Sequence, residues 1–358
     1  MKRSIIIRAS LCILVAFFFA VSLQAQELSV PEIMAEPSIA GMRPEGEKLS
    51  PDGSKVVFLW NAEGKMPRDL YLVSTSGGEP KIILRVRDVP VPKPSPTPDK
   101  KLDYGLIVKD DIAKERENQF GNFEWSPDSK KLVFTQGGDL YVLTLGESTP
   151  KRYTKTVKPE VAARFLDNDR ILYQQDGNLF VLNTADATTI QLTKEAKPAE
   201  FITVGQAVAN KTGTMIAYTV SDNSKQKALF VPNYLDEFVQ AQTIRRGWSE
   251  QRLFVTPADG SRDAAFEINL PKQEGVGGFR RIVWAVDGRS RIVDRGDTDT
   301  KRRQLFYVHN AGGKDEQTIL VTEETDEKWL APLTAIAEPN PSDASQLLFC
   351  SERDGYNH

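Results

Sequence analysis

The sequence predicts an all-β fold, a β-propeller of repeated four-stranded blades that is incomplete at its C-terminus. Two observations carry this prediction. One turn-and-strand pattern recurs along most of the 358 residues, and its clear copies are separated by 40 residues (Pro127 to Asp167) and 44 residues (Asp167 to Lys211). That interval matches the length of about 40–45 residues for one four-stranded propeller blade.

The repeated pattern joins a Ser-Pro-Asp-Gly-like turn to a strand, a polar turn and a second strand of the type Asp-Leu-Tyr-Val-Leu. Proline presets φ at the second position of a turn, and Asp and Gly favour the reversal that follows. The β-branched and aromatic residues after the turn favour a pleated, half-buried surface. A plain β-sandwich is the alternative, but it gives no reason for one motif to recur at a fixed interval. The copies begin at Leu49, Trp125, Leu166, Asn210, Trp284 and Pro341.

The N-terminal segment differs in kind from the rest of the chain. Lys2 and Arg3 precede a short apolar run and a small residue, Ala25, which is the pattern of a secretory signal peptide over residues 1–25. The run is shorter than the roughly 20 residues of a spanning helix, although an uncleaved anchor stays open. We therefore expect an exported protein, periplasmic or extracellular, with a lead-in segment at 26–48 and the propeller at 49–358.

Composition excludes several classes of function. The formal net charge of −3 argues against nucleic-acid binding and against a polybasic membrane surface, so no membrane contact is expected after signal cleavage. Cys12 leaves with the signal peptide, so Cys350 has no intramolecular partner. With two histidines and one mature cysteine, a zinc or copper site is not expected, and the sequence predicts no cofactor. The oligomeric state is left open.

Two insertions interrupt the repeat. Residues 88–122 carry a proline-rich stretch and then a charged stretch at 109–117 that indicates a short exposed helix. Residues 232–248 are rich in aromatic and charged residues. Loops of this length are commonly functional. Helix is expected mainly in the signal peptide and in these two insertions.

The repeated turns, the Asp-Leu-Tyr strands and the closing sequence Phe349-Cys350-Ser351-Glu352-Arg353-Asp354-Gly355-Tyr356-Asn357-His358 resemble one family. That family is the N-terminal propeller of dipeptidyl peptidase IV-like serine peptidases, of the prolyl oligopeptidase clan. The resemblance covers nearly all of the mature chain. It implies a propeller that filters access to an α/β-hydrolase domain carrying Ser, Asp and His, through which peptides would be the substrates.

The hydrolase chemistry is not expected from this sequence. A nucleophile elbow needs Gly-x-Ser-x-Gly, and the 358 residues contain no such string. A triad also needs a histidine base, and the two histidines, His309 and His358, are expected to have ordinary structural roles. We predict no catalytic residue and no hydrolysis of reporter peptides by this chain alone.

The residues that would bind a substrate are less clearly indicated by the sequence than the fold is. The family holds a peptide amine with an adjacent glutamate pair in a Tyr-Glu-Glu context, which does not occur here. Asp236 and Glu237, close to Tyr234 in the second insertion, are the better candidates, because two acids can hold an ammonium group. A solvated loop paired with Arg245 and Arg246 is the alternative. Glu323-Glu324 is a second acidic pair, in surroundings that do not match.

Three aspartates, Asp294, Asp297 and Asp299, suggest a calcium loop, but their spacing does not match the EF-hand, and a polar hairpin explains them better. Trp125 and Trp284 directly precede repeat turns and are expected in the core.

Three functions fit these observations. The first is the substrate-gating, non-catalytic propeller of an exported peptidase, present here as a fragment. The second is a stand-alone TolB-like propeller that binds a peptide or an envelope protein, and the third is a degenerate product. Because the chain stops inside a hairpin, we expect the edge at 347–351 to be open and the fragment to be aggregation-prone.

Overall fold

The computed structural model describes residues 28–33, 35, 39–89, 119–233, 240–246, 249–261, 265–272, 276–297, 299–330 and 337–356. The predicted signal peptide, the helix predicted at 109–117 and His358 lie outside these ranges. No helix in the described part of the chain is long and apolar enough to cross a membrane.

The described residues form antiparallel sheets in chain order, as the repeat predicts. Five sheets have four strands each, and a two-stranded sheet follows them. The first is β1 (Glu45–Leu49), β2 (Lys55–Trp60), β3 (Asp69–Ser74) and β4 (Lys81–Leu84), and the second is β5 (Phe123–Trp125), β6 (Lys131–Gln136), β7 (Asp139–Thr144) and β8 (Lys151–Arg152). The third is β9 (Glu160–Phe165), β10 (Arg170–Gln175), β11 (Asn178–Asn183) and β12 (Thr189–Gln191).

The later sheets keep the same order. The fourth is β13 (Ile202–Ala209), β14 (Met215–Asp222), β17 (Glu250–Pro257) and β18 (Phe266–Glu267), and the fifth is β19 (Val276–Trp284), β20 (Arg291–Asp297), β21 (Arg302–His309) and β22 (Gln317–Thr325). The last pair is β23 (Ala337–Asn340) and β24 (Asp343–Phe349), separated by a turn at 341–342. The sixth predicted copy is therefore a hairpin.

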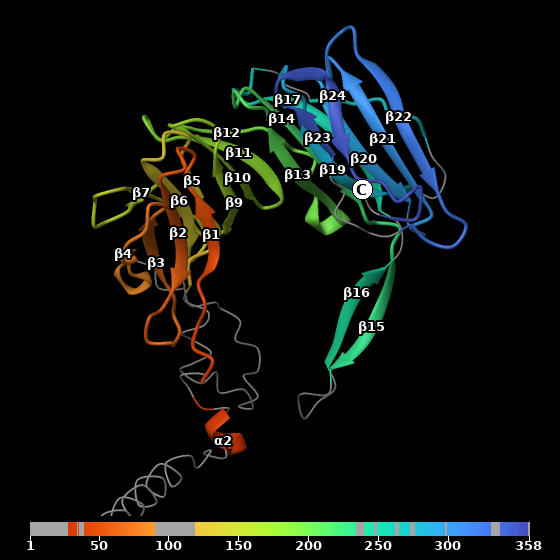
Figure 1. Cartoon of the computed structure of the whole chain (residues 1–358). Coiled ribbons are helices and arrows are strands. Elements are labelled where there is room, and N and C mark those ends of the chain that lie inside the picture. The colour runs from red at the N-terminus through yellow and green to blue at the C-terminus, as the bar shows by residue number, and fades with distance from the viewer. Residues whose placement is uncertain are drawn as a thin grey trace, which may run out of the picture.

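The sheets stand side by side in an arc, with the first strand of each sheet nearest the centre (Figure 1). These innermost strands are β1, β5, β9, β13, β19 and β23. The arrangement is that of propeller blades, and it confirms the predicted fold class. The first blade begins at Glu45, a few residues before the predicted start of the propeller at 49.

The Ser-Pro-Asp turn forms from its own side chains. Ser50 donates its main-chain N–H to Lys55 O at 2.8 Å, and its hydroxyl donates to Asp52 Oδ1 at 2.6 Å. Ser126 repeats both bonds with Lys131 (2.9 Å) and Asp128 (2.6 Å). Each bond spans five residues or fewer, so the motif specifies the turn locally.

Each turn also contacts the turn of the next blade, which gives the repeat interval a physical meaning. Two side-chain acceptors receive main-chain N–H groups, and two side-chain donors reach main-chain carbonyls. The four contacts are Asp52 N to Ser129 Oγ (3.0 Å), Asp128 N to Asn168 Oδ1 (3.0 Å), Arg170 Nη2 to Gly213 O (3.0 Å) and Asn210 Nδ2 to Gly288 O (3.1 Å).

The Asp-Leu-Tyr strands bind the segment, here called the crossover, that leads from the fourth strand of one blade to the first strand of the next. The first residue of the third strand accepts a main-chain N–H that lies 17 or 18 residues downstream, past the fourth strand. The three bonds are Val86 N to Asp69 (2.9 Å), Thr156 N to Asp139 (3.2 Å) and Ala196 N to Asn178 (3.1 Å). Val86 and Ala196 are buried, and a buried N–H needs an acceptor, which the Asp69 carboxylate and the Asn178 amide supply.

Apolar side chains fill the spaces between neighbouring sheets. Separate clusters of buried residues lie between the first and second, second and third, third and fourth, and fourth and fifth sheets. A smaller cluster of Ile292, Leu305 and Ala337 joins the fifth sheet to the last hairpin. Trp125 and Trp284, each 8% exposed, are core residues as predicted.

The insertions depart from the predicted helical content. Between β14 and β17 the chain forms a hairpin of β15 (Lys227–Asn233) and β16 (Gln240–Arg246), so the described part of the second insertion is strand, and the helix predicted there is wrong. The described helical segments are α2 (Val30–Ile33) and the 3-10 turns η1 (Val86–Asp88) and η2 (Pro198–Glu200). A two-stranded hairpin satisfies its backbone by pairing between the strands, here from Lys227 with Arg246 to Asn233 with Gln240.

Candidate functional site

The two predicted substrate-binding acids are not placed by the structure. Asp236 and Glu237 follow β15 and precede β16, and both lie outside the described residues. Their role in binding a peptide amine stays a prediction.

The other acidic pair, Glu323-Glu324, has a clear geometry that excludes a shared amine site. Adjacent residues of a strand point to opposite faces of the sheet. Glu323 accepts from Arg302 at 2.7 Å and from Gln304 at 2.6 Å, and these bonds hold the pKa of its carboxyl below the ordinary value. Glu324 instead contacts Arg303 and Arg353. The two carboxylates therefore have separate partners and do not converge on one ligand.

The described histidine has a structural partner. His309, at the end of β21, lies with Nδ1 3.2 Å from Ser290 Oγ. The Ser290 side chain is buried, and its oxygen also accepts the main-chain N–H of Asn310 at 3.3 Å. A catalytic serine has to reach substrate, and Ser290 has no exposed surface, so its contact with His309 joins two turns and is not a nucleophile with its base.

Polar side chains on the innermost strands link each blade to the next around the arc. Three of these contacts end on main-chain carbonyls of an inner strand where its register shifts, at or beside a bulge. The five contacts are the ion pair Lys48–Glu124, Asn122 to Ala163 O (3.4 Å), Arg164 to Ala207 O, Gln206 to Phe279 O (2.6 Å) and the ion pair Arg281–Glu338.

One of these inner contacts also covers a side chain of the apolar cluster between the first and second blades. The ammonium group of Lys48 also lies 5.6 Å from the centre of the Phe123 ring. Burial lowers the pKa of the Arg164 guanidinium, and the charge of Glu124 opposes that shift. Lys48, Glu124 and Arg164 on the innermost strands are thus charged groups with partners on the neighbouring blade.

The fifth blade carries a concentrated group of buried, charged side chains. Asp294 on β20 is fully buried, and Arg303 on β21 is nearly so. Arg303 donates from Nε to both oxygens of Asp294 at 3.1 and 3.2 Å and from Nη2 at 2.8 Å. This two-nitrogen contact is the favoured geometry for an arginine and a carboxylate.

The third nitrogen of Arg303 reaches the C-terminal motif. Nη1 donates to the main-chain carbonyl of Cys350 at 2.6 Å and lies 3.4 Å from Glu324 Oε2. Burial by itself lowers the pKa of Arg303, but the hydrogen bonds and charges of Asp294 and Glu324 outweigh it and raise that pKa. Arg303 therefore stays charged and holds two sheets and the motif together.

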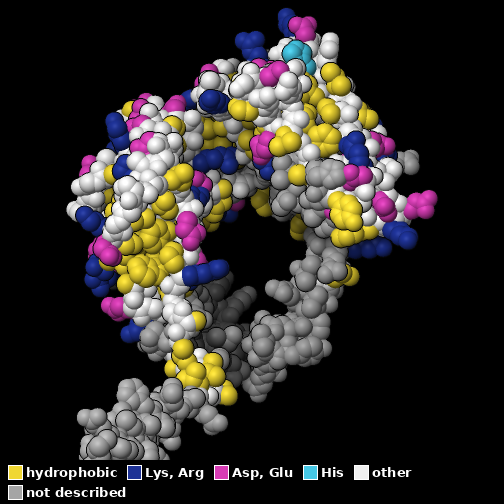
Figure 2. All heavy atoms as spheres, viewed as in Figure 1, with side chains coloured by type: hydrophobic (Ala, Val, Ile, Leu, Met, Phe, Trp, Pro, Cys, Tyr) yellow, Lys and Arg dark blue, Asp and Glu magenta, His cyan; other side chains and the backbone are white. Residues whose placement is uncertain are grey.

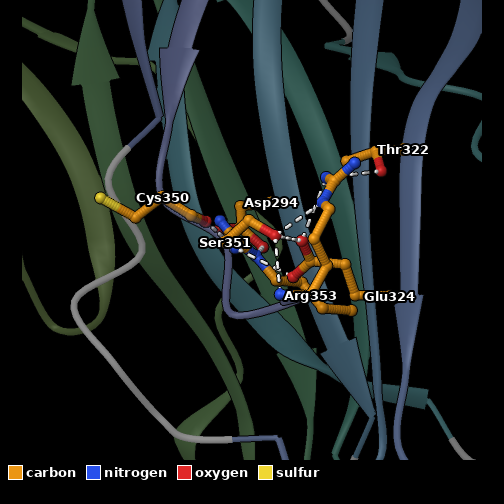
Figure 3. Close-up of polar contacts among 7 residues, drawn as sticks. Asp294, Thr322, Glu324, Cys350, Ser351 and Arg353 are labelled. Carbon is orange, nitrogen blue, oxygen red and sulfur yellow. Dashed lines mark hydrogen bonds and ion pairs between the residues drawn. The ribbon is translucent and has the colours of Figure 1, made fainter. Parts of the chain in front are cut away.

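Ser351 and Arg353 complete the cluster (Figure 3). The Ser351 hydroxyl donates to Glu324 Oε1 and accepts from Arg353 Nε at 2.8 Å. Arg353 Nη2 lies 3.3 Å from Glu324 Oε1 and 3.3 Å from Thr322 Oγ1. The Ser-x-Arg part of the closing motif is thus the segment that the buried glutamate anchors.

The cluster stands where the repeat is broken. The third strand of the first two blades begins with an aspartate, at Asp69 and Asp139, whereas the fifth has Gln304 preceded by Arg303. The sequence predicted a polar hairpin around Asp294 in preference to a calcium loop, and an acidic pair at Glu324 that does not match an amine site; Arg303 was not predicted. The signal that was available is the replacement of the expected Asp by Arg-Gln before Leu305-Phe306-Tyr307.

The cluster anchors the C-terminal motif to the fifth blade. Each charged group in it has a partner of opposite charge, and within the described residues no group of three His, Cys, Asp or Glu side chains is arranged to hold a metal ion. Asp294 lies on the hairpin that the sequence predicted, where Arg291–Val293 pairs with Tyr307 and its neighbours. The fold and this motif together point to one family.

Residues 162–358 match the family model described as the dipeptidyl peptidase IV (DPP IV) N-terminal region, which is more than half of the chain. The chain belongs to this family. The match contains the third to fifth blades, the last hairpin and the anchored motif, so the resemblance read from the sequence is confirmed.

Two solved structures share the fold. Dipeptidyl peptidase 4 of Porphyromonas gingivalis matches with a TM-score of 0.60 and 14% identity over 87% of this chain. A protein described as a dipeptidyl aminopeptidase IV from Bacteroides ovatus matches with a TM-score of 0.56 and 16% identity over 90% of this chain. The matches cover 44% and 43% of those chains, so this DPP IV N-terminal region chain spans less than half of their length.

Proposed function

We propose that this DPP IV N-terminal region chain is the substrate-gating, non-catalytic propeller of an exported prolyl oligopeptidase-type serine peptidase that takes part in peptide degradation. The family match supports the peptidase context, and the two solved relatives are described as a dipeptidyl peptidase 4 and a dipeptidyl aminopeptidase IV. The gate is the central hollow, and its wall is the set of innermost strands.

One observation carries the gating proposal. In the space-filling view the described blades curve around one side of a central hollow (Figure 2). On three of the inner strands, a side chain from the neighbouring blade bonds a main-chain carbonyl, at Ala163, Ala207 and Phe279. A peptide entering the hollow therefore meets side chains rather than open strand edges, and it passes without being captured by β-pairing.

Photo-crosslinking tests this proposal on two positions of one blade. Val161 on the innermost strand β9 is 46% exposed, and Ile190 on the outermost strand β12 is 39% exposed. With both native cysteines replaced by serine, Val161→Cys and Ile190→Cys variants are labelled with a benzophenone maleimide. Fluorescent peptides with a free N-terminus are then irradiated with each protein.

We expect capture from position 161 that unlabelled peptide competes away, and background capture from position 190. The matched exposure of the two side chains controls for simple accessibility. Equal capture at the two positions, or capture that competitor does not reduce, would rule out passage through the hollow.

Export is tested separately by the mature N-terminus. We expect the chain in the periplasm or the medium to begin at Gln26, because Ala25 provides the small residue at a signal-peptidase site. Mass spectrometry of the fractionated protein measures this. A cytoplasmic protein that retains Met1 and the apolar segment would contradict export without affecting the gating test.

A further inference from the structure

A buried guanidinium group that takes no part in the charged cluster of the fifth blade lies in the apolar layer between the fourth and fifth blades. Arg291 opens β20 and has no exposed surface. Its neighbours in register are Trp284 on β19 and Val308 on β21. Residues directly opposite each other in antiparallel strands point to the same face, and both neighbours belong to the cluster packed against the fourth blade. The side chain of Arg291 is therefore enclosed between the two blades.

The hydrogen-bond donors of this guanidinium group have no acceptor among the described residues. Its central carbon lies 3.8 Å from the centre of the Trp284 ring, so the indole covers one face of the group. An arginine donates from N–H groups that lie in the plane of the guanidinium, and a ring over the face leaves those donors free. None of the three nitrogens has a hydrogen-bond partner in the described part of the chain.

The other buried arginines of the fifth blade are paired, which makes Arg291 an exception. Arg303 binds the Asp294 carboxylate, and Arg295 donates to Pro271 O at 2.9 Å and to Gln304 Oε1 at 2.6 Å. Burial lowers the pKa of Arg291 to about 9, so the group is still charged at neutral pH. A buried charge without an acceptor is costly, and native proteins pair such a group with protein, water or an ion.

The carboxylate that acts electrostatically on Arg291 is already engaged elsewhere. This group is Glu316, which is half-buried. Its Oε2 accepts the main-chain N–H of Gly312 at 2.7 Å, and its Oε1 accepts that of Asn269 at 3.2 Å. Glu316 makes no hydrogen bond to Arg291, so it offsets the buried charge from a distance and leaves the donors unsatisfied.

We propose that the guanidinium group of Arg291 binds a small monovalent anion such as chloride, and that this anion stabilises the contact between the fourth and fifth blades. A compact anion accepts several N–H donors at once and neutralises the charge that the apolar layer encloses. A large oxyanion does not suit the position, because Arg291 has no exposed surface and the side chains packed around it are apolar. The proposal is independent of the gating function.

Denaturation of the full chain in chloride and in gluconate, at equal ionic strength and pH 7, tests the proposal. An anion that binds only the folded protein raises the folding equilibrium constant by about tenfold for each tenfold increase of its concentration above its Kd. We expect this response to chloride in the wild type and in Arg289→Met, at an exposed arginine, and no response in Arg291→Met. In gluconate Arg291→Met should be more stable than the wild type, because the buried charge is then uncompensated.

A second variant distinguishes a bound anion from an ion pair between Arg291 and Glu316 that forms in solution. Glu316→Gln removes the negative charge next to the proposed site, so it should lower the Kd for chloride several-fold. If Glu316 is instead the partner of Arg291, the wild type should show no specific response to chloride, and Glu316→Gln should create one. That result would overturn the proposal for the native protein.

A direct measurement on the wild type keeps the test valid if a variant does not fold. Bromide replaces chloride and scatters anomalously, so diffraction from crystals grown in bromide locates the anion. We expect an anomalous peak within hydrogen-bond distance of the Arg291 guanidinium. Peaks confined to the molecular surface would mean an adventitious ion only, and they would refute the proposal, as would equal responses to chloride in the wild type and in Arg291→Met.

Discussion

The indole N–H of Trp125 donates to the main-chain carbonyl of Lys48 at 3.0 Å, so the second blade caps a carbonyl on the innermost strand of the first. Trp284 does the same to Val208 O at 2.8 Å, between the fifth blade and the fourth. Both tryptophans directly precede a repeat turn, which places the indole at the same point of two blade interfaces.

We expect Trp125→Phe and Trp284→Phe to lower the free energy of unfolding by similar amounts, about 1 kcal/mol for the lost hydrogen bond and the carbonyl left unsatisfied. Chemical denaturation measures both. Trp329→Phe is the control, because Trp329 is 56% exposed, and it should change stability by less than about 0.5 kcal/mol. A loss at Trp329 as large as at Trp125 would show that the indole N–H is not the cause.

The second prediction compares two glycines at the same place in the repeat turn. Gly53 and Gly213 both have left-handed φ, +71° and +64°. A Cβ at Gly53 meets nothing within 4 Å, whereas a Cβ at Gly213 lies 2.4 Å from the carbonyl oxygen of Leu166 in the preceding blade. Gly53→Ala should cost about 1–2 kcal/mol of backbone strain.

Gly213→Ala should cost the same strain and a further 1–3 kcal/mol, on the order of an overpacked contact. Urea denaturation of the two variants measures the difference between them. Equal losses would mean that the third and fourth blades separate easily at this turn.

The third prediction concerns Arg303 in the fifth blade. Arg303→Met leaves Asp294 buried without its partner and should lower the free energy of unfolding by about 3–5 kcal/mol. Arg302→Met, at the neighbouring and more exposed arginine, should cost less than about 1 kcal/mol. Equilibrium denaturation provides the comparison.

A double variant separates the lost ion pair from lost packing. Adding Asp294→Leu to Arg303→Met removes the unpaired charge and should recover most of the stability. If the double variant is as unstable as Arg303→Met alone, anchoring of the Cys350 carbonyl by Arg303 contributes more than its pairing with Asp294.

The fourth prediction is a gain of stability. Arg291 has no exposed surface, and within the described residues none of its three guanidinium nitrogens has a hydrogen-bond partner. It stacks on the Trp284 ring at 3.8 Å, and burial lowers its pKa to about 9. Arg291→Met keeps the volume and removes the charge, so it should raise the free energy of unfolding at pH 7 by about 1–4 kcal/mol.

The stability gained in Arg291→Met should depend on pH in a defined direction. Protonation of Arg291 is disfavoured on folding, so the penalty is present at pH values below about 9 and falls as pH rises above that value. The advantage of Arg291→Met over the wild type should shrink in the same range. Arg289→Met is the control, because Arg289 is an exposed arginine two residues away, and it should give no gain in stability. A loss of stability in Arg291→Met would show that the contact of the cation with the Trp284 ring outweighs the cost of its desolvation.

The sequence by itself determined the repeat, the class of fold and the family. These follow from short-range chemistry: the Ser50 and Ser126 turns close through bonds within five residues, and runs of β-branched and aromatic residues favour the strands that follow. A pattern of that kind can be recognised in the sequence because each copy contains the residues that form its own turn. The same argument is why the hairpin at 227–246 was missed, since its register depends on pairing across an insertion that has no repeat to compare with.

Only the tertiary structure decided which charges meet. Asp294 and Arg303 are nine residues apart and Cys350 is 47 residues beyond Arg303, and sheet register and the packing of the last hairpin bring them within hydrogen-bond distance. The faces of Glu323 and Glu324 depend in the same way on strand alternation and on which neighbour covers each face. Partners of this kind are invisible in a linear pattern, because the contacts depend on the register of strands within a blade and on which element packs beside it.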